Sequence, residues 1–274
     1  MIRLAVRCRP EQAELVLGEL AVLAPNGFEE EHGDGYVEYA IYGAEGELPD
    51  LDQIEAATGE GTVEVDATEV PDDWADRWQD FHQPLLVSNR VWVRPSWAEP
   101  HPEAIDVVID PGRAFGTGAH ATTRMCIEAL VELADDDGAA VGALIDLGTG
   151  SGVLAIAAAK LGWNPVRACD HEPASLQAAA DNAAANAVEL QLSRLNLRQE
   201  LPALAPTVVA NLTSPLLRQI ASGLEGGELP QHLVCSGLLT TEADDVSAAF
   251  GRAGLGERKR RSEGDWASIS FAPR

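Results

Sequence analysis

One short segment constrains the fold of this chain more than any other. Residues 143–162 (ALIDLGTGSGVLAIAAAKLG) run from an apolar, strand-like stretch through Gly148, Gly150 and Gly152 into an alanine-rich helical stretch. Glycines at this spacing permit a tight turn and let a ligand lie against backbone N–H groups and a helix N-terminus. The next expected strand ends at Asp170. An acid there can accept hydrogen bonds from both ribose hydroxyls, so the segment predicts a site for a nucleoside-containing cofactor.

The glycine spacing bears on which cofactor is bound. A dinucleotide-binding turn has the pattern G-x-G-x-x-G, and its third glycine would fall where this chain has Val153. The third glycine stands at Gly152 instead and Asp146 precedes the turn, which is the pattern of S-adenosylmethionine sites. The glycine spacing alone is only weak evidence for one of these cofactors over the other. A nicotinamide-dependent oxidoreductase and a turn packed without a ligand therefore stay open, although Asp170 argues against the second.

Beyond about residue 100 the sequence alternates between strand-like and helix-like stretches. The expected strands are 105–110, 143–148, 166–170, 206–211, 231–237 and 266–271. The expected helices between them are 122–134, 152–162, 173–187, 214–224 and 240–254. This alternation predicts an α/β fold whose sheet is covered by helices on both faces.

Residues 1–66 follow a different rhythm. Strand and helix stretches come in the order βαββαβ, which predicts a small ferredoxin-like α+β domain. This segment holds sixteen acidic residues against three arginines. Such a domain is suited to docking a basic substrate, but an acidic surface without a partner explains the charge equally well. Residues 67–100 carry four of the six tryptophans and are expected to form an ordered connector to a domain spanning 101–274.

The overall composition limits the partners. The formal net charge is -25, whereas binding to a phosphate backbone needs clustered Lys and Arg, so we expect no nucleic-acid partner. The four cysteines lie far apart and the histidines show no metal-ligand spacing, which argues against a metal site and favours buried free thiols in a reducing compartment. Neither a secretory signal nor an apolar run of about 18 residues is present, so we expect a cytoplasmic protein without a membrane span.

A second glycine-rich segment lies upstream, at 110–124 (DPGRAFGTGAHATTR). Its glycines suit a phosphate, but a P-loop requires a lysine directly after the last glycine. The first lysine of the chain is Lys160. The segment therefore needs another kind of ligand.

Four segments together closely resemble one enzyme family. They are 110–130 (DPGRAFGTGAHATTRMCIEAL), 144–162 (LIDLGTGSGVLAIAAAKLG), 168–188 (ACDHEPASLQAAADNAAANAV) and 208–217 (VVANLTSPLL). They are similar to the ribosomal protein methyltransferases that modify large-subunit ribosomal protein eleven. Residues 72–97 also look like the connector of that family. The AFGTG-x-H-x-TT block is quite specific, whereas many methyltransferases share the G-x-G-x-G turn.

The resemblance implies a fold, a reaction and a set of site residues. The fold would be the Rossmann-like sheet of class I methyltransferases. The reaction would be N-methylation, by S-adenosylmethionine, of lysine side chains of ribosomal protein eleven, with its N-terminal amine as a further candidate. By resemblance, the cofactor-binding residues are Phe115, Gly116, Thr117, Gly118, Thr123, Gly148, Gly150, Asp170 and Asn211. The first four would fold over the methionine end of the cofactor, Asp170 would hold its ribose, and Asn211 would be the catalytic residue beside the reactive methyl.

The chain departs from the family pattern at several places, among them Ala119, Ala121, His171 and Thr213. These departures bear on target choice and rate more than on cofactor use. A methyltransferase for another protein lysine or a small molecule therefore stays open, as does a non-catalytic binding module that kept the fold. His120, the obvious candidate for a base, is expected to shape its loop instead. We expect a monomer.

Overall fold

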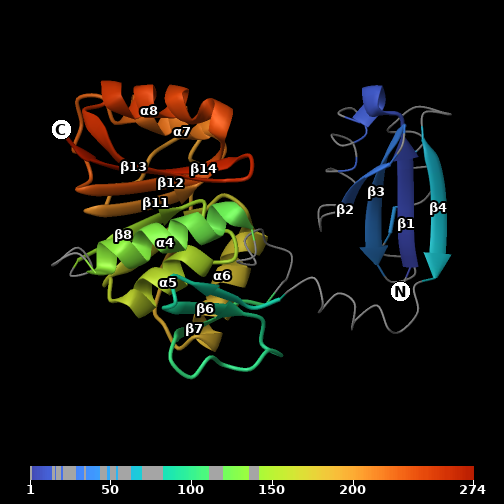
Figure 1. Cartoon of the computed structure of the whole chain (residues 1–274), viewed down its shortest axis with the longest axis horizontal. Coiled ribbons are helices and arrows are strands. Elements are labelled where there is room, and N and C mark those ends of the chain that lie inside the picture. Colours follow the sequence, from blue (N-terminus) through green and yellow to red (C-terminus); the bar gives the residue numbers. More distant parts are fainter. Residues whose placement is uncertain are drawn as a thin grey trace. The chain divides into compact units, whose positions relative to one another are not determined.

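The protein divides into two compact units, residues 1–81 and 82–274, in the computed structural model (Figure 1). The structure describes residues 2–13, 16, 20, 29–33, 35–43, 48–49, 54, 63–69, 83–110, 120–135 and 142–274. The division falls within the stretch expected as a connector. Each unit contains its own cluster of buried apolar side chains.

The first unit is built on a four-stranded antiparallel sheet. Its strands are β1 (Ile2–Cys8), β2 (Glu29–Gly33), β3 (Tyr36–Gly43) and β4 (Glu64–Glu69). The strand order β2-β3-β1-β4 and the antiparallel pairing are those of a ferredoxin-like domain, as the sequence predicts. Alternate β1 side chains Leu4, Val6 and Cys8 enter the core because successive strand residues point to opposite faces.

The expected first helix is described only in part. A 3₁₀ turn, η1, spans Pro10–Gln12, and Val16 and Leu20 are helical and fully buried in the same core as Ile54. Leu15 and Leu23, which the sequence pattern also assigns to the apolar side of this expected helix, lie outside the described residues, as do Trp74 and Trp78, two of the four tryptophans in the connector expected at 67–100.

The second unit begins with a small sheet of its own. Strands β5 (Leu85–Val87), β6 (Val91–Arg94) and β7 (Ile105–Val108) pair in the order β5-β6-β7. The sequence prediction placed 105–110 in the main sheet, and this was wrong. The physical reason lies in Asn186, whose amide both accepts from Val108 N at 2.9 Å and donates to Val108 O at 2.6 Å. The Asn186 side chain thus hydrogen-bonds to the N–H and C=O groups of Val108, which another strand would need in order to pair with β7.

The main sheet has seven strands. They are β8 (Leu144–Leu147), β9 (Val166–Asp170), β10 (Gln191–Arg194), β11 (Thr207–Asn211), β12 (His232–Leu239), β13 (Leu255–Glu263) and β14 (Trp266–Pro273). Their order is β10-β9-β8-β11-β12-β14-β13. The first five pair in parallel, and β14 runs antiparallel to both of its neighbours. The edge strands β10 and β13 were not expected from the sequence.

Helices cover both faces of this sheet, as predicted (Figure 1). Their bounds are α4 (Ala121–Asp135), α5 (Val153–Leu161), α6 (Pro173–Ala185), α7 (Ser214–Gly223) and α8 (Ala243–Arg252), with a short η2 (Thr240–Glu242) before the last. One apolar cluster lies under α4 and α5, and a second lies under α7 and α8. Because the strands β10, β9, β8, β11 and β12 are parallel, all five direct their carboxyl ends to one edge of the sheet.

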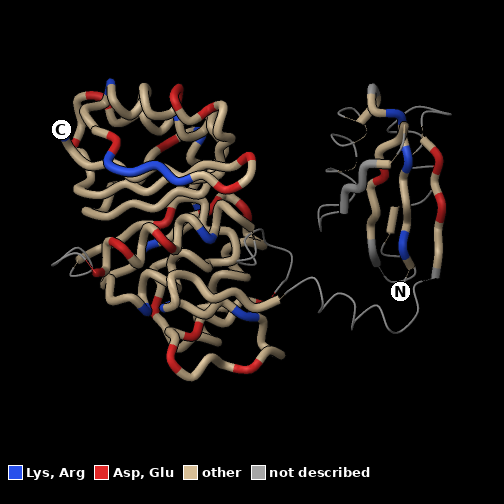
Figure 2. Tube along the Cα trace, in the orientation of Figure 1, with Lys and Arg blue, Asp and Glu red and all other residues tan. Residues whose placement is uncertain are grey.

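Strand β13 carries the densest run of basic residues, visible as a continuous blue stretch in Figure 2. Most of these charges are paired. Lys259 lies 2.8 Å from Glu132, Arg261 lies 2.5 Å from the same carboxylate, and Arg260 lies 2.8 Å from Asp244. The run is therefore a set of ion pairs along a sheet edge, offset by acids on the neighbouring helices.

All four cysteines, Cys8, Cys126, Cys169 and Cys235, are buried free thiols, which confirms that expectation. Burial raises the pKa of Cys169 to about 11, so this thiol is protonated near neutral pH. Among the helices that the structure describes, none is both long enough and apolar enough to cross a membrane.

Candidate functional site

A cavity of about 770 Å³ lies over the carboxyl ends of the parallel strands. Its walls come from the turn after β8, the end of β9, the segment after β10, the end of β11 and the start of α4. Two groups of residues line it: a nucleoside-type end around Asp170 and a second end around Asn211. This volume falls in the range of cavities that bury a small organic ligand.

The glycine turn after β8 is held by the neighbouring strand. The backbone N–H groups of Gly148 and Thr149 donate to the carbonyl oxygen of Cys169 at 2.9 and 3.0 Å. Gly148 has a φ of +76°, and a side chain there would overlap the Cδ2 atom of Leu212. Only glycine meets both requirements without strain, so the position is fixed by backbone shape and by close packing.

The carboxylate of Asp170 is fixed at both oxygens. Gly150 N donates to Oδ2 at 3.0 Å, and Glu172 N donates to Oδ1 at 3.1 Å. Asp170 is 8 % exposed and lines the cavity. A carboxylate oxygen has two lone pairs, so each still has capacity to accept a ligand hydroxyl. The structure thus brings Gly148, Gly150 and Asp170 together, as the sequence predicts.

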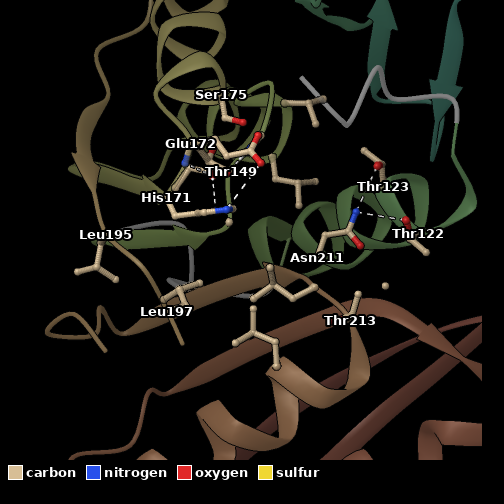
Figure 3. Close-up of a pocket in the computed structure, with 18 of the residues that line it drawn as sticks. Thr122, Thr123, Thr149, His171, Glu172, Ser175, Leu195, Leu197, Asn211 and Thr213 are labelled. Atoms are coloured by element: carbon tan, nitrogen blue, oxygen red, sulfur yellow. Dashed lines mark hydrogen bonds and ion pairs between the residues drawn. The ribbon is translucent and has the colours of Figure 1, made fainter. Parts of the chain in front are cut away.

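His171 lies beside this carboxylate, and Figure 3 shows its ring next to Glu172. Its Nδ1 is 3.3 Å from Asp170 Oδ1, and its Nε2 is 3.6 Å from Glu172 Oε1. Leu195 and Leu197 line the same end of the cavity and supply apolar surface. His171, one of the departures from the family pattern, therefore lies at the rim of the nucleoside-type end.

The second end is built where β11 meets α4. Asn211 ends β11, and its amide nitrogen Nδ2 lies 3.2 Å from Thr122 Oγ1 and 3.4 Å from Thr123 Oγ1 (Figure 3). Both threonines are buried, whereas Asn211 is half-buried and lines the cavity. The structure therefore brings Thr123 and Asn211 together from positions 88 residues apart in the chain.

The rest of the expected site is not described. Phe115, Gly116, Thr117 and Gly118 lie outside the described residues, and so does Ala119. Thr213, another departure from the family pattern, is exposed and lines the cavity.

Sequence reasoning missed several residues at the second end. Trp266, the first residue of β14, lines the cavity and contacts the His120 ring edge-on, with centroids 4.9 Å apart. Gly237 also lines it, at a bulge in β12 where its φ is +84°. A strand-like pattern predicted both stretches as strands, and nothing in that pattern distinguished a cavity residue from a core residue.

Asp146 lies just beneath the glycine turn. Its Oδ2 accepts a 2.7 Å hydrogen bond from the hydroxyl of Thr149, and the residue is 1 % exposed. Burial raises the pKa of Asp146 to about 7, against the hydrogen bond from Thr149, which lowers it. This carboxyl therefore changes charge near neutral pH while supporting the turn that carries Gly148.

The strand order, the single antiparallel strand near one edge and a cavity beside the acid that ends β9 define the class I methyltransferase fold. The chain belongs to the family of ribosomal protein L11 methyltransferases (PrmA), whose model matches residues 14–274.

Individual relatives agree with this membership. The chain is 45% identical to the ribosomal protein L11 methyltransferase of Vibrio vulnificus over 179 residues, which cover 64% of this chain and 59% of the relative. It is 42% identical to that of Vibrio cholerae over 202 residues, which cover 72% of this chain and 66% of the relative. The matches thus span about six tenths of the length of these relatives.

A solved structure shows the same fold. The crystal structure of the ribosomal protein L11 methylase from Lactobacillus delbrueckii subsp. bulgaricus superposes with a TM-score of 0.63 at 26% identity. The match covers 70% of this chain and all of that one.

Proposed function

We propose that this protein is an S-adenosylmethionine-dependent methyltransferase that N-methylates lysine side chains of ribosomal protein L11, with the N-terminal amine of L11 as a further candidate. The observation that carries the proposal is one cavity that holds a fixed ribose-type acceptor, Asp170, at one end and the Asn211 amide at the other. Family membership supports both the reaction and the target.

The described residues fit the nucleoside half of this cofactor. Asp170 is proposed to accept hydrogen bonds from the ribose hydroxyls, and Leu195 and Leu197, which line the same cavity, are proposed to contact the adenine. Because Gly148 and Gly150 have no side chain, the cofactor can approach the backbone of the turn closely. Phe115, Gly116, Thr117 and Gly118, with Thr123, are proposed to surround the methionine end. When bound, the cofactor supplies an electrophilic methyl group on a sulfonium.

The chain's own residues then have to deliver an amine to that methyl. The reaction is an in-line displacement, so alignment of nucleophile, methyl and leaving sulfur is the main task. A lysine amine has a reference pKa of about 10.4 and must lose a proton before it attacks. A desolvated pocket lowers that pKa, so no strong general base is required. Asn211 is proposed to orient the amine through its amide.

We assign substrate recognition to the acidic N-terminal unit. The first 66 residues hold sixteen acidic residues against three arginines, which complements a basic target protein. The buried free thiols also support a reducing compartment, the cytoplasm. That the protein acts as a monomer stays a prediction.

Two measurements on the full chain test the proposal. Calorimetry with S-adenosylmethionine should show one binding site per chain. If no binding is seen, the protein is a non-catalytic module that kept the methyltransferase fold but does not bind the cofactor. Mass spectrometry of ribosomal proteins incubated with protein and cofactor should show added methyl groups on L11. Cofactor binding with methylation only of some other protein or small molecule would contradict the target and favour the alternative acceptor.

A further inference from the structure

We infer that His120 is a positioning residue: acting through Thr122, it fixes the Asn211 amide so that its oxygen Oδ1 is free to accept a hydrogen bond from the acceptor amine. The inference rests on the proposed function, because it names a residue that serves that reaction. Four hydrogen bonds among His120, Thr122, Thr123 and Asn211 constrain one another's directions.

The His120 ring is in contact with two polar groups of Thr122. Its Nδ1 lies 3.3 Å from the backbone N of Thr122 and 2.7 Å from the hydroxyl oxygen of the same residue. A peptide N–H can only donate, so Nδ1 must be an acceptor and the neutral ring carries its proton on Nε2. The Thr122 hydroxyl must therefore also donate its hydrogen to Nδ1.

The direction of the Thr122 hydroxyl bond determines which atom of the Asn211 amide faces it. Because the Thr122 hydroxyl has already donated its hydrogen, Oγ1 can only accept from the group 3.2 Å away. That group must be the amide nitrogen Nδ2 and not the amide oxygen. Its second hydrogen faces Thr123 Oγ1 at 3.4 Å. The network thereby assigns the amide orientation, which heavy-atom positions alone leave ambiguous.

The amide oxygen of Asn211 is left on the side away from these hydrogen bonds. Among the described residues no donor contacts Asn211 Oδ1, and the dashed lines in Figure 3 run to both threonines from the amide nitrogen. An amine that donates one N–H to it is held in a fixed orientation relative to the methyl. With the amide flipped, its NH₂ group would face the amine and compete for the lone pair that must attack.

Neighbouring groups keep His120 in the required state. The Trp266 ring packs edge-on against it at an interplanar angle of 71°. Burial lowers the pKa of His120, against the charge of Glu263, which raises it. Glu263 is itself ion-paired with Arg124. The neutral, accepting ring is therefore the form present near pH 7.

Matched variants test the inference. Thr122→Val removes the hydroxyl and keeps the shape, whereas Thr122→Ser keeps the hydroxyl. His120→Leu removes the acceptor, whereas His120→Asn offers an amide oxygen near the position of Nδ1. We expect kcat for L11 methylation to fall on the order of tenfold to a hundredfold in the Val and Leu variants. The Ser and Asn variants should keep most of kcat, and the dissociation constant of S-adenosylmethionine should change little in all four.

Two further readouts separate positioning from mere packing. The double variant Thr122→Val/His120→Leu should be no slower than Thr122→Val alone, because both act through one chain of hydrogen bonds. Nitrogen NMR of the wild-type imidazole should show the His120 proton on Nε2. Additive losses, an unchanged kcat in the Val and Leu variants, or a proton on Nδ1 would each overturn the inference. A wild-type protein that binds cofactor but leaves L11 unmethylated would overturn the proposed function, and the NMR tautomer would then decide the network by itself.

Discussion

The backbone N–H of Gly150 donates a 3.0 Å hydrogen bond to the carboxylate of Asp170. This bond ties the glycine turn after one strand to the acid at the end of the next. It orients the carboxylate across the cavity, and Glu172 N holds the other oxygen at 3.1 Å.

Asp170→Asn should therefore weaken cofactor binding. The substituted amide turns an NH₂ group toward one of two backbone donors, and it loses the charge that strengthens a hydrogen bond to ribose. We expect the dissociation constant of S-adenosylmethionine to rise about tenfold to a hundredfold, measured by calorimetry. Asp181→Asn, at an exposed position on α6, is the matched control and should bind like the parent. Equal affinity in the two variants would remove Asp170 from the site.

Gly148→Ala should cost more stability than backbone strain alone explains. Gly148 and Gly226 share a φ of +76°, but only at Gly148 would a methyl group overlap Leu212, since nothing lies within 4 Å of that position at Gly226. Denaturant unfolding should show a loss of about 1–2 kcal/mol for Gly226→Ala. Gly148→Ala should lose roughly 0.5–1.5 kcal/mol more, because the end of the Leu212 side chain has to move aside, and bind cofactor more weakly. An identical loss of unfolding free energy in the two variants would mean that the Leu212 side chain moves aside without cost.

Asp146→Asn should change how stability depends on pH. Burial raises the folded-state pKa of Asp146 from 3.8 to about 7. Between these values the folded state holds a proton that the unfolded state has released, so the wild type loses stability as pH rises. The Asn variant does not titrate, so its free energy of unfolding relative to wild type should rise from pH 4 to pH 7 and then level off. Urea titrations at four pH values check this. The control variant Asp181→Asn should show the same difference in free energy of unfolding from wild type at every pH.

Truncation to residues 82–274 should separate cofactor binding from target recognition. The second unit contains two of the three apolar clusters and every described residue of the cavity, so it is expected to fold and to bind S-adenosylmethionine as the full chain does. Methylation of L11 should be lost. Circular dichroism and calorimetry supply the folding and binding controls, and undiminished methylation by the truncated chain would assign recognition to the second unit instead.

The sequence predicted the parts of the site that follow one another along the chain. The strand, glycine turn, helix and acid at 143–170 form a local pattern whose geometry is set by glycine and by apolar burial. The pairing of Thr122 and Thr123 with Asn211, and of His120 with Trp266, depends on which strands become neighbours. The hydrophobic periodicity of a single segment does not determine which strands become neighbours in the sheet.

The missed strands have equally physical reasons. β10 is a four-residue edge strand with three exposed side chains, so apolar alternation is almost absent from it. β13 is mostly exposed along its basic stretch, where Lys259, Arg260 and Arg261 form ion pairs with acids on other elements, so it shows no apolar alternation. Strand 105–108 was recognised as a strand, but its pairing was set by Asn186, 78 residues downstream of Val108.

The most direct test of the central claim is to incubate the full chain with tritiated S-adenosylmethionine and unmethylated large-subunit ribosomal proteins, and to locate the label by gel and mass spectrometry. The proposed function predicts label on ribosomal protein L11, at lysine amines, and weaker labelling by the Asp170→Asn variant when the cofactor is kept near the wild-type dissociation constant. Label on other proteins with none on L11, from a protein that still binds the cofactor, would contradict it.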